Sequence, residues 1–348
     1  MRTTKSAVLT ALAVAATLVL AACGGGEAET PSEAGAESGT DRSFIYLTND
    51  PIGVNKFLES GKLGIELAAE TYDGTSKTYE GSNEESNRAN LEAAVAEAPD
   101  VIVMITFDFE DMAKEFAEAN PDQEFLLIDS CPAGAPTNLK CAVFREQEAA
   151  YLLGVEAGLL TETNTVGSVA AIDIPFLHRY TDSFALGAAS VNPEVQDKQL
   201  FIGGANPFGD PARGKEQALA MAATGADHVF AVASGSNGGV FEAAVERGFT
   251  SYGVDVNQCP DAPGFVGDGT IKAVEVLVVT EIGKILDGTA EGISSYGLEE
   301  GGMDIVSLTE GAADSQCTVM EYPEVVEQLA EVKQQIIAGE ITIPDPTA

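Results

Sequence analysis

Polar and aromatic side chains follow several short apolar runs in this 348-residue chain. Asp129 ends the run EFLLID and Asp255 ends TSYGVD, while Asp50, Phe107 and Ser234 stand at or just after the ends of three similar runs. Carboxylates in such places accept hydrogen bonds, and they act in acid–base chemistry when their pKa values are suitable. Open α/β sheets bind ligands beyond the carboxyl ends of their strands, so we expect these residues to face one cleft. The alternative for an acid such as Asp255 is a cap on the next element.

The sequence offers no convincing catalytic centre. Its two histidines, His178 and His228, are far apart, and it contains neither a G-x-S-x-G nor a C-x-x-C motif. The stretch GDPARGKE (209–216) matches the phosphate-binding pattern G-x-x-x-x-G-K, but Glu216 replaces the Ser or Thr that binds magnesium. Pro211 also removes a backbone donor from that stretch. We therefore predict a protein without catalytic residues, metal or cofactor.

The charge of the chain is strongly one-sided. Fifty-five acidic residues face 18 Lys and Arg, which gives a formal net charge of −37. Such a field repels phosphate backbones, so we expect no nucleic-acid partner. An acidic, solvated surface is the ordinary interpretation of this charge.

The amino terminus has the pattern of an exported protein. Residues 1–22 combine a basic start with a short apolar stretch, as a signal peptide does. The segment Leu20-Ala21-Ala22-Cys23 resembles a bacterial lipobox, which implies a lipid on the Cys23 sulfur and a protein tethered to the extracytoplasmic face of the cell membrane. An ordinary secretory signal with a chance cysteine is the alternative. Residues 23–42 are rich in Gly, Glu, Ser and Pro, and we expect a flexible stalk there.

Four further cysteines suggest disulfide bonds, because an even number is typical of exported proteins. They are Cys131, Cys141, Cys259 and Cys317, which allow three pairings. The short loop favours Cys131–Cys141 and leaves Cys259–Cys317. Free thiols or a metal site are the alternative.

Strand-like and helix-like segments alternate along the chain after residue 42. Such alternation predicts an α/β fold with doubly wound parallel sheets, and the number of strands is too large for one compact sheet. We therefore predict two α/β lobes. The clearest strand-like runs are residues 43–48, 75–80, 100–107, 124–129, 165–172, 198–204, 227–233 and 250–255.

Several stretches together resemble the basic membrane lipoprotein family, the purine-nucleoside-receptor type of ABC-transporter substrate-binding protein. They are FREQEAAYLLGVEAGLLTETNTVGSVAAI, NPFGDPARGKEQA, SGSNGGVFEAAVERG, YGVDVNQ and GTIKAVE. The resemblance implies a type I periplasmic-binding-protein fold, in which two lobes with three crossovers hold a ligand in a hinged cleft. It also implies nucleoside capture and delivery to a membrane permease. With such crossovers we expect residues 43–146 plus 256–290 in the first lobe and 147–255 plus 291–348 in the second.

The resemblance assigns roles to individual residues. The acid of the GVD motif and the lysine of the K-x-V motif, here Asp255 and Lys272, hold the ribose hydroxyls in this family. Phe208 and Phe176 match aromatic residues that stack on the base, and Asp129 matches the acid that reads it. For each of these residues the alternative is structural: a cap, a surface lysine or core packing. Ser234 belongs to a Gly-rich turn whose backbone N–H groups face the cleft.

The first family motif departs from its usual form. Asp50 can stand for its first acid, but Asn55 occupies the position of a second acid, and the serine before Phe57 is missing. An amide both donates and accepts hydrogen bonds, whereas a carboxylate only accepts, so the part of the base that is read can differ. A related polar ring compound is therefore an alternative ligand, and a nucleoside-processing enzyme or a ligand sensor is an alternative function.

Overall fold

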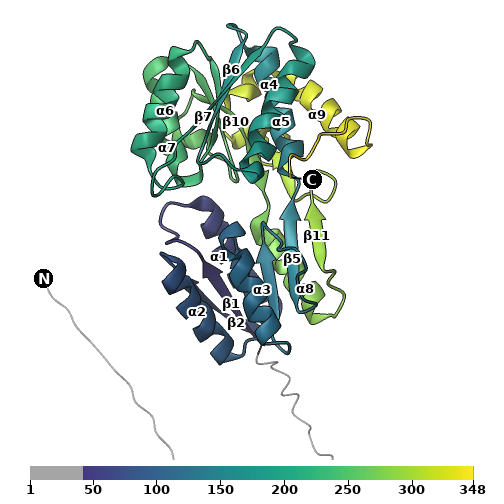
Figure 1. Ribbon diagram of the computed structural model, residues 1–348. Helices are drawn as coiled ribbons and strands as arrows, with labels where there is room; N and C mark the ends of the chain where they lie inside the picture. The colour runs from purple at the N-terminus through teal and green to yellow at the C-terminus, as the bar shows by residue number, and fades with distance from the viewer. Residues whose placement is uncertain (1–41, 348) are drawn as a thin grey trace, which may run out of the picture. The chain divides into compact units, whose positions relative to one another are not determined.

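The computed structural model describes residues 42–347. The expected signal peptide (1–22), the lipidation site Cys23 and all but the last residue of the expected stalk lie outside them. The described residues belong to one compact unit that contains two six-stranded sheets (Figure 1). No helix among them has the length and apolar character needed to cross a bilayer.

The first sheet has the strand order β11-β5-β4-β3-β1-β2, and every neighbouring pair in it is parallel. Helices α1 and α8 cover one of its faces, and α2 and α3 cover the other. The strand β3 is buried throughout and β4 is buried after Glu124, which explains their continuous apolar runs. The elements are β1 (Arg42–Thr48), α1 (Lys56–Thr71), β2 (Gly74–Glu80), α2 (Glu84–Glu97), β3 (Val101–Ile105), α3 (Glu110–Ala119), β4 (Glu124–Ile128), β5 (Leu139–Phe144), α8 (Val274–Leu286) and β11 (Ile293–Tyr296).

The second sheet has the order β12-β10-β9-β8-β6-β7, with β12 antiparallel to β10 and the other pairs parallel. Helices α4 and α5 pack together so closely that position 154 has no room for a side chain. A Cβ added to Gly154 on α4 would lie 2.0 Å from the carbonyl oxygen of Phe184 on α5. The elements are α4 (Glu146–Leu160), β6 (Thr165–Ala170), α5 (Pro175–Val191), β7 (Gln196–Phe201), α6 (Pro211–Ala223), β8 (His228–Val232), α7 (Asn237–Arg247), β9 (Thr250–Gly253), β10 (Val266–Lys272), β12 (Met303–Ile305) and α9 (Pro323–Ile337).

We call each sheet with its helices a lobe, and the chain passes between the lobes three times. The crossovers follow β5, β10 and β11. The expected lobe boundaries differ from this arrangement at two strands. β10 was expected in the first lobe but pairs with β9 in the second, and β11 was expected in the second but pairs with β5 in the first. The first lobe therefore consists of 42–144 plus 274–296, and the second of 146–272 plus 303–337.

The four described cysteines form two disulfides. Cys131 pairs with Cys141, and Cys259 pairs with Cys317, with Cα–Cα distances of 5.4 and 4.9 Å. These are the pairs that the short loop between Cys131 and Cys141 favours. The second bond closes a separation of 58 residues and ties the loop after β9 to the segment before α9. A disulfide of this kind contributes about 2–4 kcal/mol to stability.

Candidate functional site

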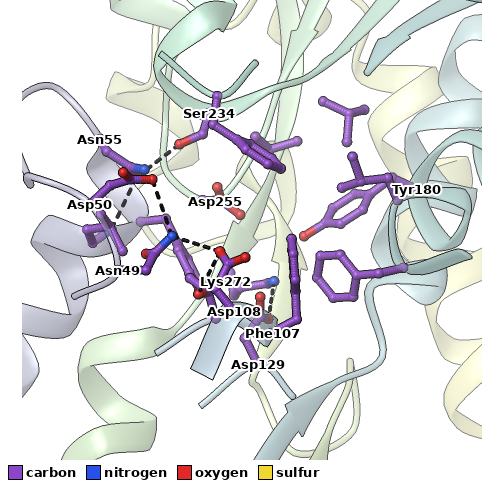
Figure 2. A pocket seen from close by; sticks show the side chains of 18 residues that line it. Asn49, Asp50, Asn55, Phe107, Asp108, Asp129, Tyr180, Ser234, Asp255 and Lys272 are labelled. Atoms are coloured by element: carbon purple, nitrogen blue, oxygen red, sulfur yellow. Dashed lines mark hydrogen bonds and ion pairs between the residues drawn. The ribbon is translucent and has the colours of Figure 1, made fainter. Parts of the chain in front are cut away.

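A pocket is lined by side chains from both lobes. Its empty space, open mouth included, is about 640 Å³. Figure 2 shows the 18 side chains that line it. All nine residues that the sequence assigned to a ligand are among them: Asp50, Asn55, Phe107, Asp129, Phe176, Phe208, Ser234, Asp255 and Lys272. The fold thus brings together the residues that sequence reasoning grouped, while their binding roles remain predictions.

Strand ends position most of these side chains. Phe107, Asp129 and Ser234 come one or two residues after β3, β4 and β8, and Asp255 follows β9. Lys272 is the last residue of β10. Phe107 and Asp129 follow strands of the first sheet, whereas Ser234, Asp255 and Lys272 belong to strand ends of the second. Parallel strands of one sheet end at a common edge, and the pocket is lined from that edge of both sheets.

The turns after four of these strands share an unusual backbone conformation. Thr106, Asp129, Ser234 and Asp255 have positive φ values of 82°, 75°, 49° and 71°. Residues other than glycine rarely adopt such values, and clusters of them occur at functional sites. Sequence reasoning missed this feature because none of the four positions is a glycine.

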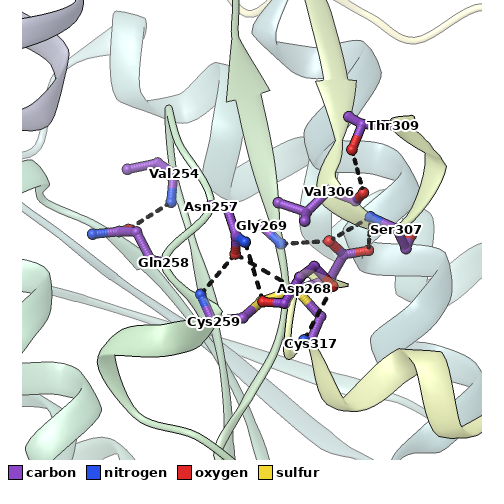
Figure 3. The surroundings of a disulfide bond; sticks show 11 residues. Val254, Asn257, Gln258, Cys259, Asp268, Gly269, Val306, Ser307, Thr309 and Cys317 are labelled. Carbon is purple, nitrogen blue, oxygen red and sulfur yellow. Dashed lines mark hydrogen bonds between the residues drawn. A yellow bond between two sulfur atoms is a disulfide. The ribbon is translucent and has the colours of Figure 1, made fainter. Parts of the chain in front are cut away.

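Side-chain hydrogen bonds fix the turn at Asp255. Gln258 Oε1 accepts from the backbone N–H of Val254 and from Asn237 Nδ2, both at 3.0 Å. Asn257 Oδ1 accepts from the N–H of Cys259 at 3.0 Å, beside the second disulfide (Figure 3). Contacts within the protein therefore hold the loop that carries Asp255.

The Asp255 carboxylate itself is half-buried and has no hydrogen-bond donor among residues 42–347. In Figure 2 it lies within the pocket, without a dashed line to the other side chains drawn. Burial raises the pKa of this carboxyl, and the Lys272 ammonium opposes the shift. The expected alternative, a side-chain cap on the next element, is wrong for Asp255 because its carboxylate oxygens accept from no backbone N–H of residues 42–347.

Lys272 lies in a buried ion cluster. Its Nζ donates to Asp129 Oδ1 at 2.7 Å and to Glu146 Oε1 at 3.0 Å, and its side chain is 2% exposed. Burial disfavours the ammonium, but Asp129, Glu146 and Asp255 outweigh this effect and raise the pKa of Lys272 well above its ordinary value. The surface-lysine alternative is wrong.

Asp129 belongs to the same cluster. Burial raises its pKa to about 7, Glu146 and Asp255 add to the rise, and Lys272 opposes it. Glu146 is the first residue of α4 and is fully buried, although it does not line the pocket. Sequence reasoning missed Glu146. The feature that could have indicated its role is an acidic residue at the start of a strongly apolar helix.

Amides and further acids also line the pocket. Asn49 Nδ2 donates to Asp108 Oδ2 at 2.8 Å and to Asp50 Oδ2 at 3.3 Å. Burial and the charge of Asp50 raise the pKa of Asp108. Asn55 caps α1 by accepting from the N–H of Leu58, and its Oδ1 also accepts from Ser234 in the other lobe.

Aromatic rings form the apolar part of the pocket. The Phe107 and Phe176 rings lie 5.8 Å apart between centroids, and Tyr180 stands edge-on to Phe176 at 6.4 Å. Lys272 Nζ lies 5.1 Å from the centroid of Phe57, which also lines the pocket. Flat rings beside hydrogen-bonding groups suit a ligand with a flat ring and polar substituents. Within residues 42–347, no group of His, Cys, Asp and Glu side chains has an arrangement that could hold a metal ion.

Comparisons with known proteins agree with this architecture. A family described as ABC transporter substrate-binding protein, PnrA-like (Bmp) matches residues 44–347. The ABC transporter nucleoside-binding protein BmpA of Lactococcus lactis is 29% identical, and the match covers 97% of each chain. An uncharacterized lipoprotein of Pyrococcus abyssi is 30% identical over 82% of this chain and 72% of its own.

A solved structure is similar over most of the chain. The solute-binding protein of an ABC transporter system from Aeropyrum pernix superposes with a TM-score of 0.75 and 27% sequence identity. The superposition covers 88% of this chain and 94% of that protein.

Proposed function

Because the chain belongs to the PnrA-like Bmp family of ABC transporter substrate-binding proteins, we propose that it captures a nucleoside, preferably a purine nucleoside, and delivers it to a membrane permease without changing it chemically. The observation that carries this proposal is the meeting of Asp255 and Lys272 with aromatic rings in one pocket. The name of the Lactococcus lactis relative supports the ligand class.

The hydrogen-bonding capacity of the pocket favours a ligand that is rich in donors. Four carboxylates line it, those of Asp50, Asp108, Asp129 and Asp255, against the single ammonium of Lys272. Asp255 can accept from two vicinal hydroxyls, as ribose presents them, in charge-assisted hydrogen bonds. Lys272 uses two of its three N–H groups on Asp129 and Glu146, which leaves one for a ligand oxygen.

The same charges disfavour anionic ligands. A phosphate would enter a pocket whose one ammonium is already paired with two carboxylates. Like charges at close range cost several kcal/mol of binding free energy, of the order found for mismatched interfaces. The proposed substrate class is therefore the unphosphorylated nucleoside.

We assign the base to the aromatic rings. Phe176 and Phe208 line the pocket, and stacking on one ring contributes roughly 1–3 kcal/mol per base. We assign the reading of the base edge to the amide and acid groups of Asn49, Asn55 and Asp108, which also line the pocket.

Calorimetry and thermal shift on the purified protein test the function. We expect adenosine, guanosine or inosine to bind and to raise the melting temperature, because a ligand that binds the native state stabilises it by mass action. Free bases, ribose and the matching nucleoside monophosphate are the controls, and each should bind about tenfold or more weakly. No binding by any nucleoside, or equal binding of the monophosphate, would contradict the proposal.

The anchoring at Cys23 is part of the proposal, and the lipoprotein names of relatives support it. Cys23→Ala should release the protein from the membrane fraction. Retention of the variant in that fraction would argue against a lipid anchor.

A further inference from the structure

The last described residues of the chain follow α9 and reach α5 of the second lobe. Ile341, Ile343 and Asp345 are partly buried, whereas Thr342 and Pro344 between them are exposed. This alternation is typical of an extended segment that lays one side on the protein. Ile341 and Ile343 pack against the main hydrophobic core, and Asp345 reaches an arginine of α5.

That arginine, Arg179, connects the tail to the ion cluster. Its Nε and Nη2 donate to the two oxygens of Asp345 at 3.0 and 2.9 Å, and Nη2 also donates to Thr347 Oγ1 at 2.7 Å. Its remaining nitrogen, Nη1, donates to Glu146 Oε2 at 3.2 Å. The planar guanidinium presents its donors at fixed angles, so binding on one side orients the other.

The connection continues into the pocket. Glu146 uses its second oxygen, Oε1, to accept from Lys272 Nζ at 3.0 Å. An unbroken series of ion pairs thus runs from Asp345 through Arg179 and Glu146 to Lys272. Neither Arg179 nor Glu146 lines the pocket.

We propose that the C-terminal segment positions the ligand-binding lysine: Asp345 fixes Arg179, Arg179 fixes Glu146, and Glu146 holds the Lys272 ammonium at the cleft. This proposal rests on the proposed function, in which Lys272 contacts the ligand. Arg179 and Asp345 are positioning residues, because they act through Glu146 and touch no ligand themselves.

Charge explains why the lysine needs this support. Asp129 and Glu146 are two buried carboxylates that share the Lys272 ammonium. A buried charge without sufficient partners is strongly destabilising. Arg179 supplies the second positive charge, and without it the two acids would compete for Lys272 and draw it from its place. Arg179 also lies over the Phe176 ring at 5.9 Å, so it supports a second pocket residue.

The sequence of the tail suits this role. Asp345 stands between Pro344 and Pro346. Each proline fixes its own φ and restricts the residue before it, so few conformations of Asp345 are lost when the segment docks. A segment that covered the core alone would need the two isoleucines but not an aspartate held in this way.

The test compares two variants of the full chain that each remove one ion pair. Asp345→Asn weakens the pair with Arg179, and Asp304→Asn weakens the pair between Asp304 and Lys333, which is similarly exposed and has no link to Glu146. The first measurement is the ¹⁵N signal of the Lys272 ammonium in the ligand-free protein, assigned by its loss in Lys272→Met. The second is the affinity for the purine nucleoside that binds the unmodified protein.

We expect Asp345→Asn to shift the Lys272 signal and to weaken nucleoside binding about 3- to 10-fold, a usual effect for mutations along a connected network. Asp304→Asn should change neither. An unchanged signal and affinity in Asp345→Asn, or equal changes in both variants, would overturn the proposal. If the unmodified protein binds no nucleoside, the proposed function fails, and the Lys272 signal alone decides whether the tail positions the lysine.

Discussion

Ser234 Oγ donates a hydrogen bond to Asn55 Oδ1 at 2.9 Å, and this bond joins the two lobes beside the pocket. Ser234 follows β8 in the second lobe, and Asn55 is the N-cap of α1 in the first. Asn55, which departs from the usual family motif, therefore takes part in a contact between the lobes, as the Lys272–Asp129 ion pair also does. A carboxylate at position 55 could also accept from Ser234. The Asn55 amide has, in addition, two N–H donors on Nδ2, and no residue in 42–347 accepts from them.

Ser234→Ala should weaken ligand binding without unfolding the protein. The lost bond joins two neutral groups and contributes about 0.5–1.5 kcal/mol, so we expect a loss of affinity of roughly 2- to 12-fold. Ser234→Ala is a better choice than Asn55→Ala, because loss of the α1 cap would itself cost about 1 kcal/mol. Calorimetry measures the change, with Ser76→Ala on exposed β2 as control. Equal affinities of the two variants would contradict a role of this bond in binding.

Asp255→Asn should remove most of the affinity for a nucleoside. The substitution keeps the size of the side chain, and asparagine tolerates the positive φ of 71°, so the turn remains. It removes the negative charge that strengthens hydrogen bonds from ligand hydroxyls. Such bonds contribute about 1.5–3 kcal/mol, which predicts a loss of roughly 10- to 100-fold. Asp73→Asn is the matched control, since Asp73 also has a positive φ but does not line the pocket. Retained affinity in Asp255→Asn would remove this residue from the proposed site.

Lys272→Met should destabilise the fold as well as abolish binding. It leaves the buried carboxylates of Asp129 and Glu146 without their shared partner. Breaking a buried pair from one side costs about 3–5 kcal/mol. Urea unfolding measures the loss, and the double variant Lys272→Met with Asp129→Asn should recover part of it, because one unpaired charge is then removed. If Lys272→Met lowered the free energy of unfolding by less than about 1 kcal/mol, the ion pairs of Lys272 would contribute little to stability.

Glu156→Gln should keep or raise stability at pH 8. Glu156 is fully buried on α4, and burial with the nearby Asp268 raises its pKa well above the ordinary value. Burial also raises the pKa of Asp268 to about 6. Both shifts favour the protonated acid in the folded state, so the free energy of unfolding should fall as pH rises above about 4, where these acids ionise in the unfolded chain.

Glutamine resembles the protonated form of Glu156 and does not titrate, so the variant should have a flatter pH dependence of stability between pH 5 and 8. Urea unfolding at both pH values checks this, with the exposed Glu118→Gln as control. A pH dependence as steep as that of the unmodified protein would contradict the shifted pKa of Glu156.

Local sequence was sufficient for much of the fold and the pocket. The alternation of apolar runs and helical segments predicted two α/β lobes, and motifs scattered along the chain predicted the family; both are confirmed. The convergence of Asp129, Ser234 and Asp255 could be predicted because each follows a strand of one of the two lobes, and open α/β sheets bind ligands beyond the carboxyl ends of their strands.

Only the tertiary structure decided which sheet each late strand joins and what holds Lys272 in place. The local sequences of β10 and β11 indicate strands but do not indicate which sheet each strand joins. That depends on pairing, of β10 with β9 and of β11 with β5. The series from Asp345 to Lys272 joins residues 166, 33 and 126 positions apart. Charges so far apart leave no pattern along the chain, because their attraction depends on distances and burial that exist only after folding.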